Sequence, residues 1–151
     1  MQDQISLDTE ADTEQFARAL APRCQLGDVI GLQGPVGVGK TLFARAFIRE
    51  LTGAQEVPSP SFTLVQTYET EGVEVWHADL YRLAEIDELL ELGLTDAFDT
   101  AICLIEWPER LGSFAPPQLT TLRFTIPDST EDRRDVTITG PATARLLDTA
   151  A

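Results

Sequence analysis

The sequence predicts an α/β fold with three layers, in which helices cover both faces of one mixed β-sheet. Helical and strand-like hydrophobic patterns alternate along the first half of the chain. Strand pairs joined by short polar loops follow in the second half. Alternation with helices builds parallel strands, whereas short loops join antiparallel ones. We therefore expect a mainly parallel sheet with antiparallel margins.

The first half contains two strand–helix units. Apolar and polar residues alternate over 5–7, which indicates a short first strand, and Asp12–Thr13 is predicted to cap the helix that follows. The apolar run 29–32 is typical of a buried strand. A helical pattern then occupies 40–51, and Gly53 stands where helices commonly end in the left-handed conformation.

The middle of the chain begins with an irregular segment. Two prolines within 57–61 remove backbone donors and fix φ, so no regular element is expected there. The runs 62–68 and 73–77 flank a short polar stretch and predict a β-hairpin. Apolar residues at helical spacing predict a short helix over 86–92 that ends at Gly93.

The last third is predicted to return to strands. The run 101–105 is apolar throughout and indicates a second buried strand. The runs 119–126 and 136–138 alternate well enough to form a terminal strand pair, with 127–134 as their loop. A last short helix is expected over 142–147.

Composition limits the classes of function. The 151 residues, 43% of them hydrophobic, fit one compact domain, and no apolar run reaches the ~18 residues of a membrane span. The acidic N-terminus lacks the pattern of a secretory signal. Cys24 and Cys103 lie far apart without metal-ligand spacing, so we expect reduced thiols in a cytoplasmic protein.

Charge bears on the partners. The net charge is −14, and no cluster of lysine or arginine exceeds the pair Arg133–Arg134. Strong direct binding of nucleic acid needs several cationic contacts that displace counterions. A role in a nucleic-acid pathway is therefore expected to operate through another protein.

One segment carries a specific chemical signature. Residues 34–41, Gly-Pro-Val-Gly-Val-Gly-Lys-Thr, match the Walker A pattern G-x-x-x-x-G-K-[ST] at every fixed position, between a predicted strand and a predicted helix. The glycines let the backbone curve around an anion with its N–H groups inward, and the helix N-terminus adds its dipole. Lys40, the only lysine in the chain, would bridge the β- and γ-phosphates, and the Thr41 hydroxyl would ligate Mg²⁺.

This signature predicts a P-loop NTPase-like fold that binds a nucleoside triphosphate with Mg²⁺. Guanine selectivity in P-loop GTPases commonly comes from an Asn-Lys-x-Asp element, but the chain has no asparagine and no second lysine. No Asp-x-x-Gly follows the loop either. ATP is therefore the expected nucleotide. Its expected contacts within the loop are Gly34, Gly37, Val38, Gly39, Lys40, Thr41 and Leu42.

Mg²⁺ at such a loop also needs a carboxylate from the end of a neighbouring strand. Glu106 follows the apolar run 102–105, and Asp79 ends the second strand of the predicted hairpin, so either could face the phosphates. Glu106 is favoured because its strand is uniformly apolar and hence central. His77, the only histidine, and Trp107 stand at positions that are more often structural than catalytic.

With these residues placed, the sequence resembles the TsaE family, small bacterial P-loop ATPases of tRNA threonylcarbamoyladenosine biosynthesis. The resemblance covers about residues 13–134. Beyond the loop it rests on four further motifs in order: Ser59-Pro60-Ser61-Phe62-Thr63-Leu64, His77-Ala78-Asp79-Leu80-Tyr81-Arg82-Leu83, Glu88 to Gly93, and Ile105-Glu106-Trp107-Pro108-Glu109. An ordered set of this kind is far more specific than the loop alone.

The resemblance implies roles on the metal side of the site. Thr41 and Glu106 would ligate Mg²⁺, and Asp79 would be needed for hydrolysis or metal support. The expected catalytic residues are therefore Lys40, Asp79 and Glu106. The segment that contains Ser59 would behave as a switch.

It also implies further nucleotide contacts and protein partners. Thr13 and Arg134 would lie near the nucleotide, with Arg133 as an adjacent alternative to Arg134. The residue pattern alone points to neither.

The resemblance implies two protein partners. They would be TsaD, which transfers the threonylcarbamoyl group, and TsaB, and they would stimulate an ATPase that is weak alone. The acidic chain suits docking to a protein rather than to tRNA.

Two other functions stay open. A small-molecule P-loop kinase usually needs an arginine-bearing lid, but only Arg110 lies between Glu106 and the terminal strands. A non-hydrolysing, nucleotide-gated binding module also fits, because no residue is clearly placed to position water. The chain departs from the usual family pattern at Pro35–Val36, Val38 and Ser61, and none of these changes removes a phosphate donor or a metal ligand.

Overall fold

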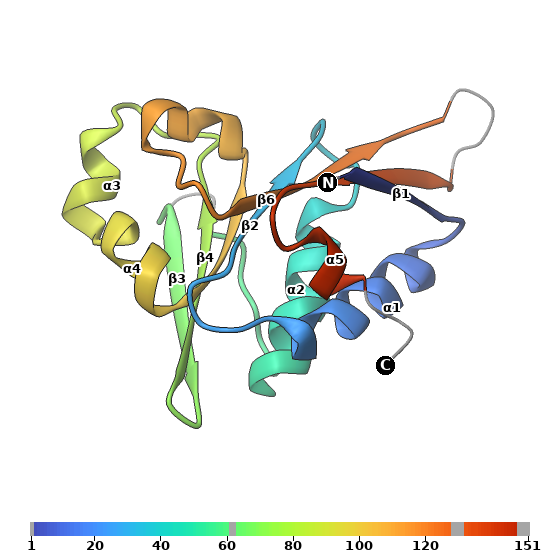
Figure 1. Ribbon diagram of the computed structural model, residues 1–151, viewed down its shortest axis with the longest axis horizontal. Helices are drawn as coiled ribbons and strands as arrows, with labels where there is room; N and C mark the ends of the chain where they lie inside the picture. Colours follow the sequence, from blue (N-terminus) through green and yellow to red (C-terminus); the bar gives the residue numbers. More distant parts are fainter. Residues whose placement is uncertain (1, 61–62, 128–131, 148–151) are drawn as a thin grey trace.

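Seven strands form one mixed sheet in the computed structural model of the chain (Figure 1). The structure describes residues 2–60, 63–127 and 132–147. Across the sheet the strand order is β1-β7-β6-β2-β5-β4-β3. The strands are β1 (Gln2–Leu7), β2 (Val29–Gln33), β3 (Val65–Thr70), β4 (Val73–Asp79), β5 (Ile102–Glu106), β6 (Leu119–Thr125) and β7 (Arg134–Thr139).

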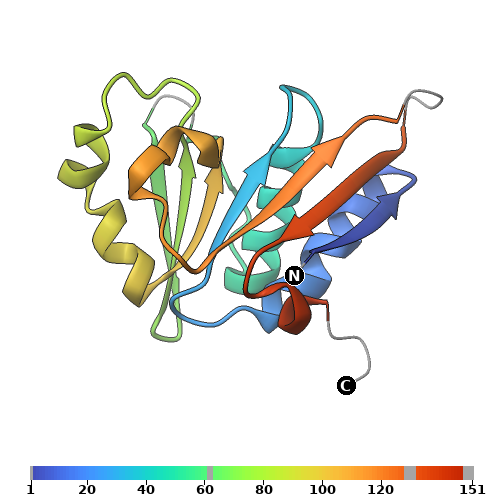
Figure 2. The same cartoon turned by 45° about the horizontal axis from the view of Figure 1, so that its top comes forward.

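Parallel pairing joins the four central strands β6, β2, β5 and β4. Antiparallel pairing adds β7 and β1 at one margin and β3 at the other. The predicted mixed sheet is thus confirmed, with its parallel centre and antiparallel margins. Because the four parallel strands run in one direction, their carboxyl ends meet at one edge of the sheet, as the arrowheads in Figure 2 show.

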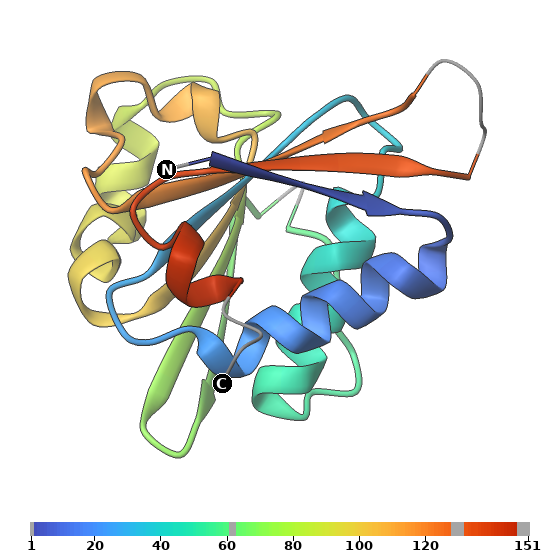
Figure 3. The same cartoon turned by 45° about the vertical axis from the view of Figure 1, so that its right-hand side comes forward.

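Helices cover both faces of the sheet, which confirms the three layers (Figure 3). On β5, Ile102 and Leu104 pack into the core beneath α1 and α2, whereas Cys103 and Ile105 pack into the core beneath α3 and α4. The uniformly apolar sequence of this strand follows from its burial on both faces. The helical segments are α1 (Glu10–Leu20), η1 (Ala21–Arg23), α2 (Lys40–Thr52), α3 (Asp87–Leu92), α4 (Leu94–Thr100), η2 (Pro108–Phe114) and α5 (Thr143–Leu146).

The start of the first helix corrects the sequence prediction. Thr9, rather than Asp12–Thr13, is the N-cap of α1. The Thr9 hydroxyl accepts the Asp12 amide at 3.2 Å, and the Asp12 carboxylate accepts the Thr9 amide at 3.2 Å. This reciprocal capping box satisfies two amides at the helix end. It also places Thr13 inside the first turns of α1, where its side chain is buried.

Other elements also differ from expectation. Helix α4 was not predicted, because Gly93 (φ 82°) both ends α3 and begins α4. The predicted strand over 62–68 begins only at Val65, after Leu64 with its left-handed φ of 68°. Ser61 and Phe62 lie outside the described residues. No helix in the described part of the chain has the length and apolar character needed to cross a bilayer.

An ion pair fastens α5 to the turn before β2. Arg145 donates to the two carboxylate oxygens of Asp28 at 2.6 and 2.9 Å, and to the carbonyl of Arg23 at 2.7 Å. Only 10% of the Asp28 side chain is exposed, so removal of Arg145 would leave a largely buried carboxylate without its cation. We expect Arg145→Ala to lower the free energy of unfolding by about 2 kcal/mol, measured by urea denaturation.

Arg49→Ala is the matched control for that change, because Arg49 lies exposed on α2. Its expected effect is below about 0.5 kcal/mol. If the two substitutions destabilise the protein equally, the ion pair has no special part in holding α5.

Candidate functional site

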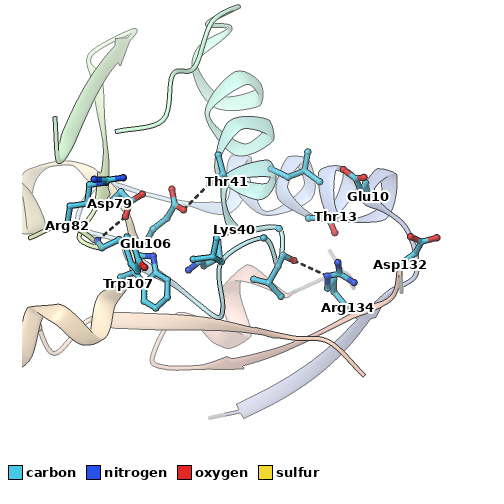
Figure 4. Close-up of a pocket in the computed structure, with 16 residues that line it drawn as sticks. Glu10, Thr13, Lys40, Thr41, Asp79, Arg82, Glu106, Trp107, Asp132 and Arg134 are labelled. Carbon is cyan, nitrogen blue, oxygen red and sulfur yellow. Dashed lines mark hydrogen bonds between the residues drawn. The ribbon is translucent and has the colours of Figure 1, made fainter. Parts of the chain in front are cut away.

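A pocket of about 470 Å³ lies at the edge where the parallel strands end (Figure 4). Its walls come from the loop after β2, the first turn of α2, the ends of β4 and β5, α1 and the start of β7. Segments far apart in the sequence thus meet in one cavity. The predicted site residues that line it are Thr13, Gly37, Val38, Gly39, Lys40, Thr41, Leu42, Asp79, Glu106 and Arg134.

The loop backbone has the form expected of an anion cradle. Gly37 and Gly39 adopt left-handed φ values of 81° and 115°, which disfavour other residues. Gly39 is the N-cap of α2 and provides no side-chain acceptor, so the amides of the first turn are available to a ligand. Gly34 does not line the pocket; a Cβ there would lie 2.7 Å from the Phe124 carbonyl, so glycine lets the loop pass close to β6.

Lys40 is held against the wall of the pocket. Its residue surface is 4% exposed, and its Nζ donates to the Gly34 carbonyl at 2.6 Å. The same Nζ lies 3.6 Å from the centre of the Trp107 ring, a cation–π contact. Burial lowers the pKa of Lys40, while attraction to nearby carboxylates, Glu106 foremost, acts in the opposite direction.

The turn after β5 directs the Trp107 ring to that position. Trp107 has a left-handed φ of 61°, a conformation that is costly for a bulky residue. Its amide donates to the Leu32 carbonyl at 3.2 Å, and its ring lies 4.9 Å from that of Tyr81. These contacts hold the aromatic face beneath Lys40.

Glu106 and Thr41 are in contact at the wall of the pocket. Glu106 ends β5, the immediate neighbour of β2, and is 2% exposed. Its Oε1 accepts the Thr41 hydroxyl at 3.2 Å. A buried carboxylate and a hydroxyl therefore meet beside the loop, as the apolar strand before Glu106 predicted.

Asp79 lies next to Glu106 on the adjacent strand. The two residues are partners in the parallel register of β4 and β5, and Asp79 is 6% exposed. Its carboxylate accepts the Tyr81 amide at 3.0 Å, and its own amide donates to the Leu64 carbonyl at 2.9 Å. Both acids that the sequence left open as candidates thus border the same cavity.

Thr13 and Arg134 lie at the opposite end of the pocket from these acids (Figure 4). Arg134 begins β7, and its Nε donates to the Val38 carbonyl at 3.1 Å. Arg133 instead pairs with Asp135 at 3.2 Å and does not line the pocket. Of the two adjacent arginines, Arg134 is therefore the one at the cavity.

Several pocket residues were not selected from the sequence as binding residues. They are Glu10, Val36, Tyr81, Arg82, Trp107 and Asp132. Tyr81 and Arg82 stand two and three residues after Asp79, so their place in the motif was the available signal. Ser59, expected in a switch, is not among the lining residues.

His77, whose position the sequence indicated to be structural rather than catalytic, makes a contact that the sequence did not indicate. Its side chain is fully buried, and its Nε2 lies 2.8 Å from Glu106 Oε2. A lone histidine in a strand gave no indication of this contact, which depends on how β4 and β5 pair.

The candidate metal-ligand atoms beside the loop, the Thr41 hydroxyl and the Glu106 carboxylate, are oxygens. In the described part of the chain, no three His, Cys, Asp or Glu side chains gather into a cage that could hold a metal unaided. A hydroxyl and a carboxylate beside a phosphate loop suit Mg²⁺, which prefers oxygen and usually keeps water and phosphate ligands. The residues present therefore fit Mg²⁺ rather than a structural zinc ion.

Comparison with known proteins gives one consistent result. The model of the family described as "Threonylcarbamoyl adenosine biosynthesis protein TsaE" matches residues 7–136. A "tRNA threonylcarbamoyladenosine biosynthesis protein TsaE" from Rickettsia bellii is 37% identical over 137 residues, which cover 90% of this chain and 94% of that protein. The protein of the same name from Bacillus subtilis is 33% identical, over 85% of this chain and 79% of its own length.

A solved structure agrees with these sequence matches. The crystal structure of Bacillus subtilis YdiB superposes with a TM-score of 0.73 at 25% sequence identity. The match covers 93% of this chain and 86% of that one. The arrangement of strands and helices is therefore shared along nearly the whole chain.

Proposed function

The chain belongs to the TsaE family, and on that basis we propose that it binds and hydrolyses ATP in tRNA threonylcarbamoyladenosine biosynthesis. It acts on a complex of TsaD and TsaB rather than directly on tRNA. The observation that carries the ATPase proposal is the meeting of Lys40, Thr41 and Glu106 in one pocket at the edge of the sheet.

The loop and the first turn of α2 bind the phosphates. Backbone amides from Gly37 to Leu42 donate to phosphate oxygens, and the helix dipole adds to the attraction. When ATP binds, Lys40 gives up its hydrogen bond to the Gly34 carbonyl and donates to the β- and γ-phosphates instead. Thr13 and Arg134, at the other end of the cavity, contact the nucleoside side of the ligand.

Thr41 and Glu106 hold Mg²⁺. Their oxygens already lie 3.2 Å apart, Thr41 on the helix that follows the loop and Glu106 at the end of β5, the neighbour of β2. The ion, when bound, neutralises charge on the phosphate oxygens and orients them for attack. The protein supplies the position of these two ligands and excludes water from the buried Glu106 carboxylate.

Asp79 serves hydrolysis from the end of β4. Its carboxylate borders the cavity beside Glu106 and belongs to a strand in direct register with β5. We expect Asp79→Asn to lower ATP turnover ~100- to 1,000-fold and to leave nucleotide affinity within roughly threefold, since the charge acts on the reaction rather than on binding. Single-turnover kinetics and calorimetric titration measure the two quantities separately.

Asp99→Asn on α4 is the control for Asp79→Asn, because it removes the same charge from an exposed position outside the pocket. It should leave both quantities unchanged. If Asp79→Asn instead weakens nucleotide binding and leaves the turnover per bound ATP unchanged, Asp79 belongs to the binding residues.

Protein partners follow from the charge of the chain. A net charge of −14 opposes direct binding to a phosphate backbone and favours docking to protein surfaces. ATP turnover measured alone, with TsaB, with TsaD and with both should be weak for the isolated chain and rise when both are present. Absence of ATP binding together with absence of stimulation would rule out this function.

A further inference from the structure

His77 occupies the same face of the sheet as the proposed metal ligand. Along β4, side chains alternate between faces, and Val75 packs into the core beneath α2. His77 and Asp79 follow at steps of two and so share that face. Along β5, Leu104 packs into the same core, and Glu106 follows it by two residues. His77 therefore lies behind Glu106, on the side away from solvent.

The hydrogen bonds of His77 fix which ring nitrogen carries the proton. Nε2 lies 2.8 Å from Glu106 Oε2, and a carboxylate oxygen only accepts, so Nε2 donates. Nδ1 is buried without a hydrogen-bond partner among the described residues. An unsatisfied buried ring nitrogen destabilises the fold, a cost that an apolar side chain at this position would avoid.

The imidazole of His77 helps to fix the position of the Glu106 carboxylate. Glu106 Oε2 accepts from His77 and Oε1 accepts from Thr41, so both oxygens are fixed although the glutamate side chain has three rotatable bonds. Each oxygen keeps a further lone pair. The carboxylate is thereby held toward the loop before any ligand arrives, which lowers the entropy lost on binding a cation.

We propose that His77 is a positioning residue for Mg²⁺: its Nε2–H holds the Glu106 carboxylate in the orientation that the cation requires. This inference rests on the proposed function, because it assigns Glu106 to Mg²⁺. Hydrogen bonds behind a metal ligand typically govern metal affinity by ~10- to 100-fold. Nucleotide contacts that do not involve the cation are independent of His77.

Three substitutions separate positioning from core packing. In His77→Gln the carboxamide nitrogen reaches about as far as Nε2 and can donate to Glu106. In His77→Asn the carboxamide ends near the level of Nδ1 and cannot. His77→Leu fills the space without any donor. If His77 were purely structural, the Mg²⁺ affinities of the variants would follow their thermal stabilities alone and would not depend on the reach of the side-chain donor.

The measurement is the affinity for a non-hydrolysable ATP analogue, titrated by calorimetry in Mg²⁺ and again in excess EDTA, with a thermal melt of every variant. His77→Leu and His77→Asn are expected to lose ~10- to 100-fold in Mg²⁺ affinity and to keep the affinity in EDTA within roughly threefold. In His77→Gln, the increase in nucleotide affinity that Mg²⁺ produces is expected to stay within roughly threefold of that in the parent.

Two results would overturn the proposal. In the first, Mg²⁺ increases the nucleotide affinity of His77→Asn and His77→Leu as much as it does that of the parent. In the second, His77→Gln and His77→Asn lose Mg²⁺ affinity equally. If the leucine variant does not fold, the Gln and Asn pair decides, since both are polar and differ mainly in reach. A parent protein that binds no nucleotide in either condition would overturn the proposed function itself. That result differs from one in which the parent binds the nucleotide and the His77 variants show the same Mg²⁺ dependence as the parent.

Discussion

Replacing Lys40 with alanine is expected to weaken ATP binding at least ~100-fold, equivalent to about 3 kcal/mol, and to leave the fold intact. The ammonium has three donors, and in the described structure one of them is used, by the Gly34 carbonyl. Burial lowers the pKa of Lys40, whereas attraction to the carboxylate of Glu106 acts in the opposite direction, and the Trp107 ring makes a cation–π contact with the ammonium. Phosphate oxygens provide the acceptors that the remaining donors lack. Calorimetric titration with ATP measures the loss.

Arg49→Ala is again the control, because it removes one positive charge from the same helix at an exposed position outside the pocket. Its ATP affinity should match that of the parent. Lys40→Arg keeps the charge, but the larger planar guanidinium does not fit the buried position of a compact ammonium beside the Gly34 carbonyl, so only partial recovery is expected. An ATP affinity of Lys40→Ala within threefold of the parent, roughly 0.6 kcal/mol, would show that the loop does not bind phosphate.

Glu106→Gln is expected to remove the effect of Mg²⁺, with at least a ~100-fold loss in both Mg²⁺ affinity and ATP turnover. The amide keeps the shape of the side chain but has one accepting oxygen, whereas the carboxylate accepts from both Thr41 and His77. Nucleotide affinity in EDTA should stay the same or rise, since a negative charge beside the phosphates is gone. Turnover against Mg²⁺ concentration and titration in EDTA test the two parts.

Glu109→Gln controls for charge alone. Glu109 also acts electrostatically on Lys40 but is exposed and does not line the pocket. Its loss should leave the Mg²⁺ dependence unchanged. If Glu106→Gln binds ATP and supports all threonylcarbamoyladenosine formation without hydrolysing ATP, the protein is a nucleotide-gated binding module.

The strand and the helix that flank the glycine-rich segment could be predicted because their determinants are local. The glycines, Lys40 and Thr41 lie within eight consecutive residues, 34–41, between a strand and a helix that also follow from local patterns. The place of Glu106 at the end of a central strand needed one further inference, because a uniformly apolar strand is buried on both faces and hence central. The contact between Thr41 and Glu106 agrees with that reasoning.

Contacts between distant strands could not be predicted in this way. Arg134 reaches the Val38 carbonyl across 96 positions of sequence, and only the family resemblance pointed to it. The contact between His77 and Glu106 depends on which strand lies beside β4 and in what register. A single sequence does not contain that information, so the histidine was judged by its type alone.

The errors in the elements have local causes. A glycine normally ends a helix, yet Gly93 joins two helices in series, and the spacing of Leu94, Ala97 and Phe98 was the overlooked signal for the second. At α1, the reciprocal bonds of Thr9 and Asp12 outweighed the simpler expectation that Asp12 caps the helix.

Calorimetric titration of the unmodified protein with ATP and Mg²⁺ tests whether the pocket binds this nucleotide and this cation. We expect one ATP site per chain, weaker binding in EDTA, and a marked preference for ATP over GTP. Heat changes no larger than those of buffer dilution, or equal binding of ATP with and without Mg²⁺, would contradict the assignment of this pocket to ATP and Mg²⁺.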